Sequence, residues 1–163
     1  MRIEKDFKEF LSSLVSRKAK FLIVGGFAYS YYAEARFTKD LDVFVERSEE
    51  NSRRVSSAVR DFLGDSLGLK ASDLLEPRTL VQLGFPPLRI DITTHCDGIL
   101  FRNAWKNRVA GKYGDLDPPD LLALRLDRKE VGILPFRNHL CPLPTRKFVK
   151  KAFMRSALSW TNR

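Results

Sequence analysis

The stretch FLIVGGFAYSYYAEARFTKDLDVFV, which runs from Phe21 to Val45, decides the fold of this chain. Its first four residues are apolar without a break, as in a strand that is buried on both faces. Gly25 and Gly26 end that run, a short helix is expected after them, and residues 41–45 form a second apolar strand. This order predicts a β-sheet with helices packed on it.

Further elements are expected on both sides of this stretch. Ser48 is a candidate N-cap for a helix that runs to about Leu63, because two glutamates follow it in the positive first turn. Asp117 followed by Pro118 is a typical helix start, an acidic cap before a proline in the first turn. That helix is expected to run over residues 117–129, and others over residues 4–17, 27–34 and 101–108. Strands are expected over residues 79–83 and 88–93. They are joined as a hairpin at Gly84 and the prolines after it.

The fold class that follows is α+β, with a mixed sheet of about four to five strands and helices packed on it. A single globular domain is expected to span residues 1–130. Residues 131–163 are expected to form a basic C-terminal extension, in which residues 146–155 are compatible with a helix.

The positive charge is placed unevenly. Residues 1–100 hold 15 Lys or Arg and 15 Asp or Glu, whereas residues 101–163 hold 14 bases and 5 acids and so carry the whole net charge of +9. From residue 131 onward there are seven bases and no acid. Such asymmetry favours a polyanionic partner such as RNA, because basic side chains release counterions from phosphates. The alternative is a solvated tail without a specific partner.

Composition narrows the class of protein. No apolar run approaches the roughly 18 residues that a membrane span needs, and the first residues mix acids and bases, unlike a signal peptide. Cys96 and Cys141 lie far apart, which argues against a disulfide framework. We therefore expect a cytoplasmic protein with no membrane partner.

Gly25 and Gly26 suggest a phosphate cradle. Glycine lets backbone amides approach a ligand closely, and the N-terminus of the helix that follows favours negative charge. The motif is neither a Walker loop, which needs GK[ST], nor the GxGxxG fingerprint of dinucleotide-binding proteins. An ordinary turn is the alternative interpretation. Arg36, further along the same stretch, is a candidate to neutralise phosphate charge, or else a surface ion-pair residue.

Three aspartates are candidate metal ligands. Asp40 and Asp42 are two residues apart on an expected strand, so their side chains share a face. Two such carboxylates repel each other unless a cation lies between them. If the strand over residues 88–93 lies beside residues 41–45, Asp91 completes a three-carboxylate cluster that suits two divalent ions. A solvated strand edge is the alternative interpretation of the first pair.

Taken together, these features resemble polymerase-beta-like nucleotidyltransferases, and in particular the compact bacterial and archaeal group that includes AbiEii-type toxins. The resemblance covers about residues 20–130. It is carried by Gly25-Gly26, Arg36, Thr38, Asp40-Leu41-Asp42 and Arg89-Ile90-Asp91-Ile92.

The resemblance implies a function, a cofactor and a set of site residues. The expected reaction is transfer of a nucleoside monophosphate from an NTP, such as ATP, to a hydroxyl of an RNA 3′ end or of a protein. It implies two Mg²⁺ ions, with Mn²⁺ as a substitute, on Asp40, Asp42 and Asp91. The triphosphate contacts are expected from Gly25 and Gly26, where many relatives have serine at the second position, and from Arg36 and Arg125, where Arg125 stands in place of a lysine of the group.

Two other functions fit the sequence. The altered pattern after Leu124 is compatible with a catalytically inactive nucleotide- or protein-binding module of a toxin–antitoxin-like pair, with a cognate antitoxin as partner. In a basic RNA-binding protein the acids would be incidental, and binding would depend on residues 146–155.

Overall fold

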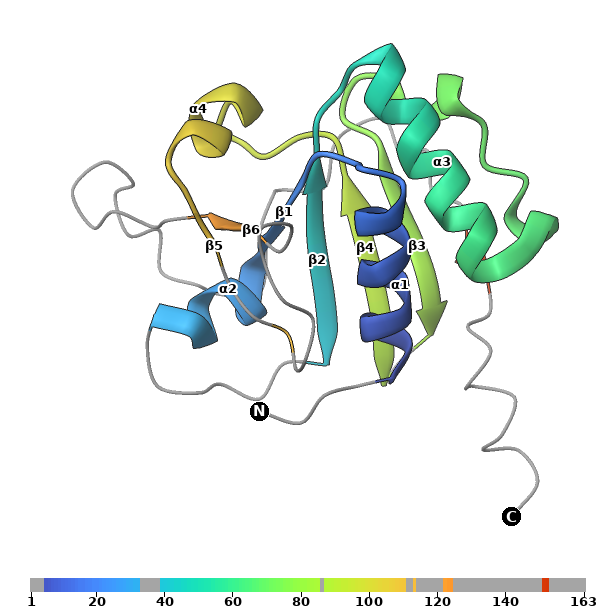
Figure 1. Ribbon diagram of the computed structural model, residues 1–163, viewed down its shortest axis with the longest axis horizontal. Coiled ribbons are helices and arrows are strands. Elements are labelled where there is room, and N and C mark those ends of the chain that lie inside the picture. Colours follow the sequence, from blue (N-terminus) through green and yellow to red (C-terminus); the bar gives the residue numbers. More distant parts are fainter. Residues whose placement is uncertain are drawn as a thin grey trace.

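The computed structural model describes residues 5–32, 39–85, 87–110, 113, 122–124 and 151–152. Within these residues the chain forms one mixed sheet with helices packed against it (Figure 1), which confirms the predicted α+β class. The sheet has the strand order β5-β6-β1-β2-β4-β3-β7. The strands are β1 (Phe21–Val24), β2 (Asp40–Val45), β3 (Leu80–Phe85), β4 (Leu88–Thr93), β5 (Arg108–Ala110), β6 (Leu122–Leu124) and β7 (Lys151–Ala152).

The centre of the sheet consists of the four strands that the sequence predicts. β1 pairs antiparallel with β2, β2 pairs parallel with β4, and β4 pairs antiparallel with β3 in the predicted hairpin. Three shorter strands extend the sheet, with β6 beside β1, β5 beside β6, and β7 beside β3. A segment of the basic extension therefore adds to the edge of the same sheet.

Helices α1 (Lys5–Ser16) and α3 (Glu49–Leu63) cover one face of the sheet (Figure 1). Their apolar stripes bury Phe7, Phe10 and Val59 against strand residues such as Leu41 and Val43. The other helices are α2 (Gly25–Tyr32), which follows β1 directly, and α4 (Phe101–Lys106), and two 3-10 turns span Gly64–Leu67 and Ala71–Leu74.

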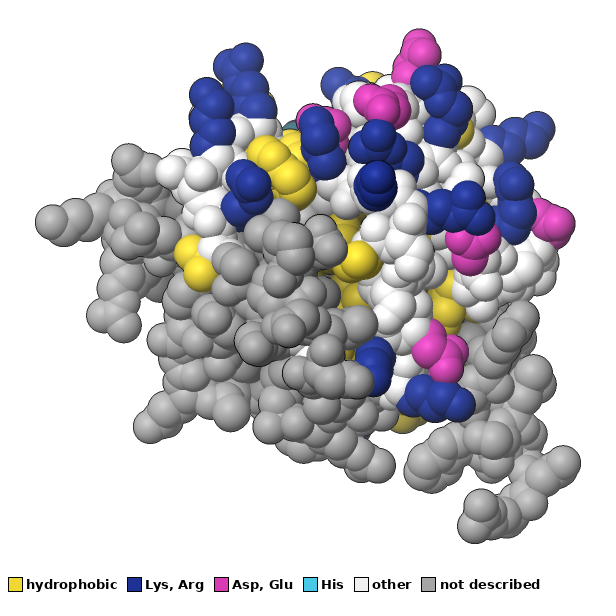
Figure 2. Space-filling view, in the orientation of Figure 1, with side chains coloured by type: hydrophobic (Ala, Val, Ile, Leu, Met, Phe, Trp, Pro, Cys, Tyr) yellow, Lys and Arg dark blue, Asp and Glu magenta, His cyan; other side chains and the backbone are white. Residues whose placement is uncertain are grey.

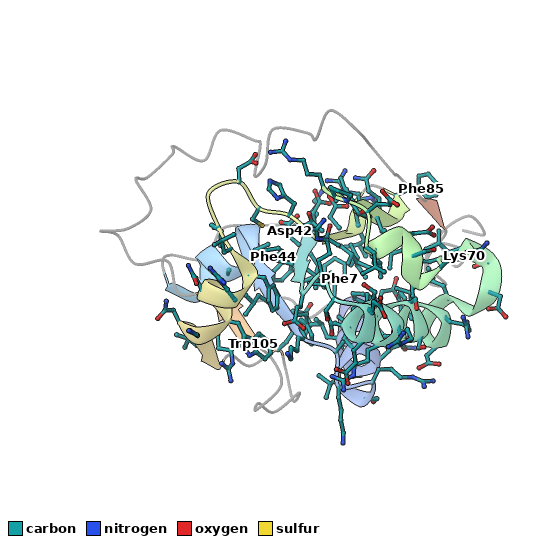
Figure 3. All side chains as sticks on the ribbon, turned by 90° about the horizontal axis from the view of Figure 1, so that it is seen from above. Phe7, Asp42, Phe44, Lys70, Phe85 and Trp105 are labelled. Atoms are coloured by element: carbon teal, nitrogen blue, oxygen red, sulfur yellow. The ribbon has the colours of Figure 1, made fainter. Side chains whose placement is uncertain are left out.

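The alternation along β2 separates the core from the other face of the sheet. Leu41 and Val43 are fully buried on the α1 and α3 side. Since side chains alternate along a strand, Asp40, Asp42 and Phe44 point to the opposite face. The positions of Asp42 and Phe44 relative to Phe7 can be followed in Figure 3.

Hydrogen bonds of the Asn51 side chain connect the start of α3 to two strands. As predicted, Ser48 caps this helix, and its hydroxyl accepts a hydrogen bond from the Asn51 backbone. The Asn51 side chain is buried, its Oδ1 accepts from the Lys20 backbone N–H at 2.7 Å, and its Nδ2 donates to the carbonyls of Lys20 and Glu46, each at 3.0 Å. One amide thus joins the start of β1 and the end of β2.

Replacing Asn51 with leucine is expected to lower the free energy of unfolding by about 2 kcal/mol or more, because three hydrogen bonds are lost and the Lys20 N–H is left without its side-chain acceptor. Urea denaturation measures this. Arg53→Ala on the exposed side of α3 is the control and should stay within about 0.5 kcal/mol of the unaltered chain. Equal stability of the Asn51→Leu variant and the control would contradict the assigned role of the amide.

Two expected elements are wrong and one is shifted. The helix predicted over residues 117–129 is contradicted at Leu122–Leu124, which form β6 between β1 and β5. These three apolar residues complete the hydrogen bonding of β1, and this tertiary pairing outweighs their intrinsic helix propensity. Likewise, Lys151–Ala152 form β7 rather than part of a helix over 146–155. The helix predicted over 101–108 ends at Lys106, and β5 begins at Arg108.

Candidate active site

Asp42 and Asp91 lie side by side on the sheet face opposite α1 and α3. β2 and β4 run parallel, and in their register Asp42 is the direct partner of Asp91, while Asp40 is the partner of Arg89. All four side chains share one face, because the residues are two apart on each strand. The register therefore places the three carboxylates of the sequence pattern on adjacent strands.

Arg89 joins the carboxylates on the two strands. Its Nη2 donates to Asp40 Oδ2 at 3.0 Å, and its Nε lies 3.0 Å from Asp91 Oδ1 in an ion pair. Charge-assisted contacts of this kind are stronger than neutral hydrogen bonds. One guanidinium thus partly offsets the negative charge of the cluster.

Gln82, on β3, holds Asp91 from the other side. It is the register partner of Asp91 in the hairpin, and its Nε2 donates to Asp91 Oδ1 at 3.3 Å and to Oδ2 at 3.5 Å. The Asp91 side chain is only 12% exposed. Contacts from two strands and this burial fix the position of the Asp91 carboxylate.

The environment raises the pKa of both central aspartates. Burial, then the charges of Asp91 and Asp40, raise the pKa of Asp42 to about 7, and Arg89 offsets part of this effect. Burial also raises the pKa of Asp91, against the opposing influence of Arg89 and Gln82. Removal from water is thus the largest reason why the ionised forms of both carboxyls are disfavoured.

Gly25 packs directly on Asp42. It follows the last residue of β1, has φ of +71°, and begins α2, so the helix starts two residues earlier than the sequence predicts. A Cβ at this position would overlap the Asp42 carboxylate, with the Asp42 Cγ only 2.8 Å away. Both the positive φ and the close approach require glycine here. The positive end of the α2 dipole is therefore held against the carboxylates.

The donor set suits a hard divalent cation. Carboxylate oxygens are the preferred ligands of Mg²⁺ and Mn²⁺. Burial and, after it, the charges of Asp91 and Asp40 disfavour the ionised form of Asp42, and a bound divalent ion would favour it. As the side chains stand, no three His, Cys, Asp or Glu of the described residues form a group around a common point. Asp40, Asp42 and Asp91 offer oxygen ligands of the right chemistry from one face of two neighbouring strands.

The remaining predicted site residues are only partly described. Gly26 is the second residue of α2, in the turn that begins beside Asp42. Arg36 and Arg125 lie outside the described residues, as does Thr38. Lys39, just before β2, is exposed.

A basic helix lies on the same face of the sheet as the acids. Phe44, two residues beyond Asp42 on β2, packs against Phe101 of α4 with ring centroids 5.1 Å apart. Trp105 stacks on Phe101, and the Arg108 guanidinium lies 4.4 Å from the centre of the indole ring. Figure 2 shows Lys and Arg side chains gathered over α4. Residues 98–114 contain four bases and no acid.

Two functional candidates escaped sequence reasoning. Arg89 was part of the sequence pattern but had no role, and Gln82 was not singled out. The sequence does contain a signal for Gln82. Once the turn of the hairpin is fixed at Gly84 and the prolines, the pairing of its two strands places Gln82 opposite Asp91. The bridge from Arg89 to Asp40 required the additional knowledge that β4 pairs with β2.

Comparisons of the chain with known protein families, curated proteins and solved structures found no match. The assignment of a function therefore depends on the chemistry of the site itself. Of the helices in the described residues, none combines the length and the apolar character that crossing a bilayer requires.

Proposed function

We propose that this chain is a nucleotidyltransferase, which transfers a nucleoside monophosphate from an NTP to a hydroxyl acceptor. The observation that carries the proposal is the register of β2 and β4, which makes Asp42 and Asp91 neighbours on one face, two residues from Asp40. A partly buried set of repelling carboxylates is costly for the fold alone, so a cation-dependent function accounts for it better than a structural one.

The chain's own residues would bind and orient the reactants. Asp40, Asp42 and Asp91 would hold two Mg²⁺ ions, which supply charge neutralisation for the triphosphate and lower the pKa of the acceptor hydroxyl. Gly25 and Gly26 at the start of α2 offer backbone amides and the positive end of the helix dipole to the triphosphate.

In the proposed reaction the acceptor oxygen forms a bond to the α-phosphorus as the bond to pyrophosphate breaks. The acceptor hydroxyl passes its proton to solvent water in this step, and we assign the Asp91 side of the cluster to the acceptor. Gln82 and Arg89 keep the Asp91 carboxylate in place through their contacts. Because positioning and charge neutralisation supply most of the catalysis, no covalent intermediate with the chain is needed.

The basic surface of α4 favours RNA as the acceptor. Arg102, Lys106 and Arg108 are exposed on or just after this helix, which packs over Phe44 on the same face as the carboxylates. A polynucleotide bound along this surface would release counterions and bring its 3′ end toward Asp42. The cytoplasm, which holds NTP, Mg²⁺ and RNA together, is the compartment that suits this reaction.

The test is incubation of the full chain with labelled NTPs, Mg²⁺ and either total RNA or total protein. We expect label in the RNA fraction, and loss of labelling when EDTA is added. Label in protein alone would keep the reaction but overturn RNA as acceptor. Nucleotide binding without transfer to either fraction would contradict the enzyme and indicate the non-catalytic module instead.

A further inference from the structure

Arg89 occupies the position of a cation within the acidic cluster. Its guanidinium contacts Asp40 through Nη2 and Asp91 through Nε, both at 3.0 Å. It reaches both because it lies opposite Asp40 in the register and two residues before Asp91 on β4. A single side chain therefore engages two of the three carboxylates that a metal ion would need.

We propose that Arg89 is an internal counterion that competes with divalent cations for Asp40 and Asp91. This inference rests on the metal site of the proposed function. When ionised, the three aspartates carry three negative charges, and the fixed guanidinium cancels one of them. A divalent ion that enters the cluster is repelled by the positive charge of Arg89. It must also displace the guanidinium from the oxygens of Asp40 and Asp91.

Within the Arg89–Asp91 pair, exposure indicates which side chain would move. The Arg89 side chain is 32% exposed, whereas the Asp91 side chain is 12% exposed and is also held by Gln82. The guanidinium can therefore turn toward solvent while the carboxylate stays in place. A planar guanidinium binds phosphate oxygens as well as it binds carboxylates.

The triphosphate of an NTP would therefore give the released Arg89 a new partner. Metal binding without nucleotide is then weak. If nucleotide raises the affinity for metal, metal raises the affinity for nucleotide by the same factor. Arg89 acts as a positioning residue in this scheme, since it sets when the carboxylates become available.

The experiment is a titration of the full chain with Mn²⁺ in the absence of nucleotide. Electron paramagnetic resonance measures the concentration of the free ion at each step. Arg89→Gln removes the charge, and Arg89→Lys keeps the charge but replaces the fork that spans two carboxylates. Arg78→Gln, which removes an arginine paired with Asp97 beyond the end of β4, is the matched control. Thermal unfolding checks that each variant is folded.

We expect the Arg89→Gln variant to bind Mn²⁺ about tenfold more tightly than the unaltered chain, since a close positive charge is removed. Arg89→Lys should lie between the two, and Arg78→Gln should match the unaltered chain. Equal or weaker binding by Arg89→Gln, with measurable binding by the unaltered chain, overturns the role of Arg89. No Mn²⁺ binding by any of these proteins overturns the metal site itself, and with it the proposed function.

A second measurement needs no substitution. In the unaltered chain the Arg89 Nε is buried and lies 3.0 Å from Asp91 Oδ1 in an ion pair, so without metal its N–H should exchange slowly with water. Addition of Mg²⁺ is expected to accelerate this exchange as the guanidinium is released. An exchange rate that stays the same while Mg²⁺ saturates the site would overturn the competition.

Discussion

Replacing Asp42 with asparagine is expected to stabilise the metal-free protein at pH 8 and, at the same time, to impair the proposed nucleotidyl transfer strongly. The stabilisation follows from the pKa of Asp42, which lies at about 7 in the folded chain against an ordinary value of 3.8. A pKa difference of this size corresponds to about 4 kcal/mol, as an order of magnitude. This is the free energy that the folded chain spends at pH 8 to keep the Asp42 carboxyl ionised. Asparagine has nearly the same shape and carries no charge, so the variant does not have this penalty.

The pH dependence has a definite sign. Between pH 4 and 7 the folded chain holds a proton on Asp42 that the unfolded chain has already released. The free energy of unfolding of the unaltered protein should therefore fall as the pH rises through this range, and then level off. In the Asp42→Asn variant the slope should be smaller, and the remainder should reflect Asp91, whose pKa is also raised. Urea titrations at several pH values with EDTA present measure both curves.

A functional carboxylate is distinguished from a structural one when its removal raises stability but lowers activity. With Mg²⁺, the unaltered chain should gain stability at pH 8, whereas the Asp42→Asn variant should gain little and lose transfer by on the order of 10³-fold. Asp61→Asn is the control for the same chemical change, because Asp61 is exposed and its pKa is lowered by Arg17. A variant that is less stable than the unaltered chain at pH 8 would contradict the electrostatic account of the site.

Gly25→Ala is expected to lower the free energy of unfolding by about 3 kcal/mol or more and to remove transfer activity. A methyl group at Gly25 meets two obstacles, the positive φ of +71° and the Asp42 side chain, whose Cγ would be 2.8 Å away. The Asp42 carboxylate has to move aside, so the cluster loses its geometry as well as its stability. Thermal and urea denaturation, together with the transfer assay, measure the two losses.

Gly64 provides a matched control for this prediction. It has the same φ of +71°, but a Cβ there would meet no atom within 4 Å. Gly64→Ala should therefore cost only the backbone strain, about 1–3 kcal/mol, and leave the proposed transfer unchanged. In an Asp42→Ala background the cost of Gly25→Ala should fall toward the Gly64 value. An equal cost in both backgrounds would show that the carboxylate is not what the methyl group meets.

Much of the fold was predictable because its central strands are short apolar runs with clear ends. The strand over 88–93 and the first strand were predicted at their observed bounds, and β2 differs by one residue, at Asp40. Burial of Leu41 and Val43 followed from alternation alone. The capped helix after Ser48 followed from local hydrogen bonding and charge. Each of these signals is local, so the sequence expresses it directly.

The parts that were not predicted depend on partners far along the chain. Leu122–Leu124 form a strand because β1 has an open side there, and nothing in Leu-Ala-Leu itself specifies a strand. Arg108 belongs to β5 for the same reason. For the site, the face of Asp42 was predictable, whereas its neighbour Arg89 and the support from Gln82 depended on strand order. Strand order is a property of the assembled sheet.

The parallel pairing of β2 with β4 also ties the chemistry to the completion of folding. Arg89 and Asp40 are 49 residues apart in the chain, and α3 and the first strand of the hairpin lie between β2 and β4. Parallel neighbours cannot meet through a short turn, so this contact closes a long loop and forms late. A nascent chain that has emerged only as far as β3 has Asp40 and Asp42 but not their partners. In the proposed enzyme, transfer would therefore require the completed sheet, because only then do Asp42 and Asp91 lie on neighbouring strands.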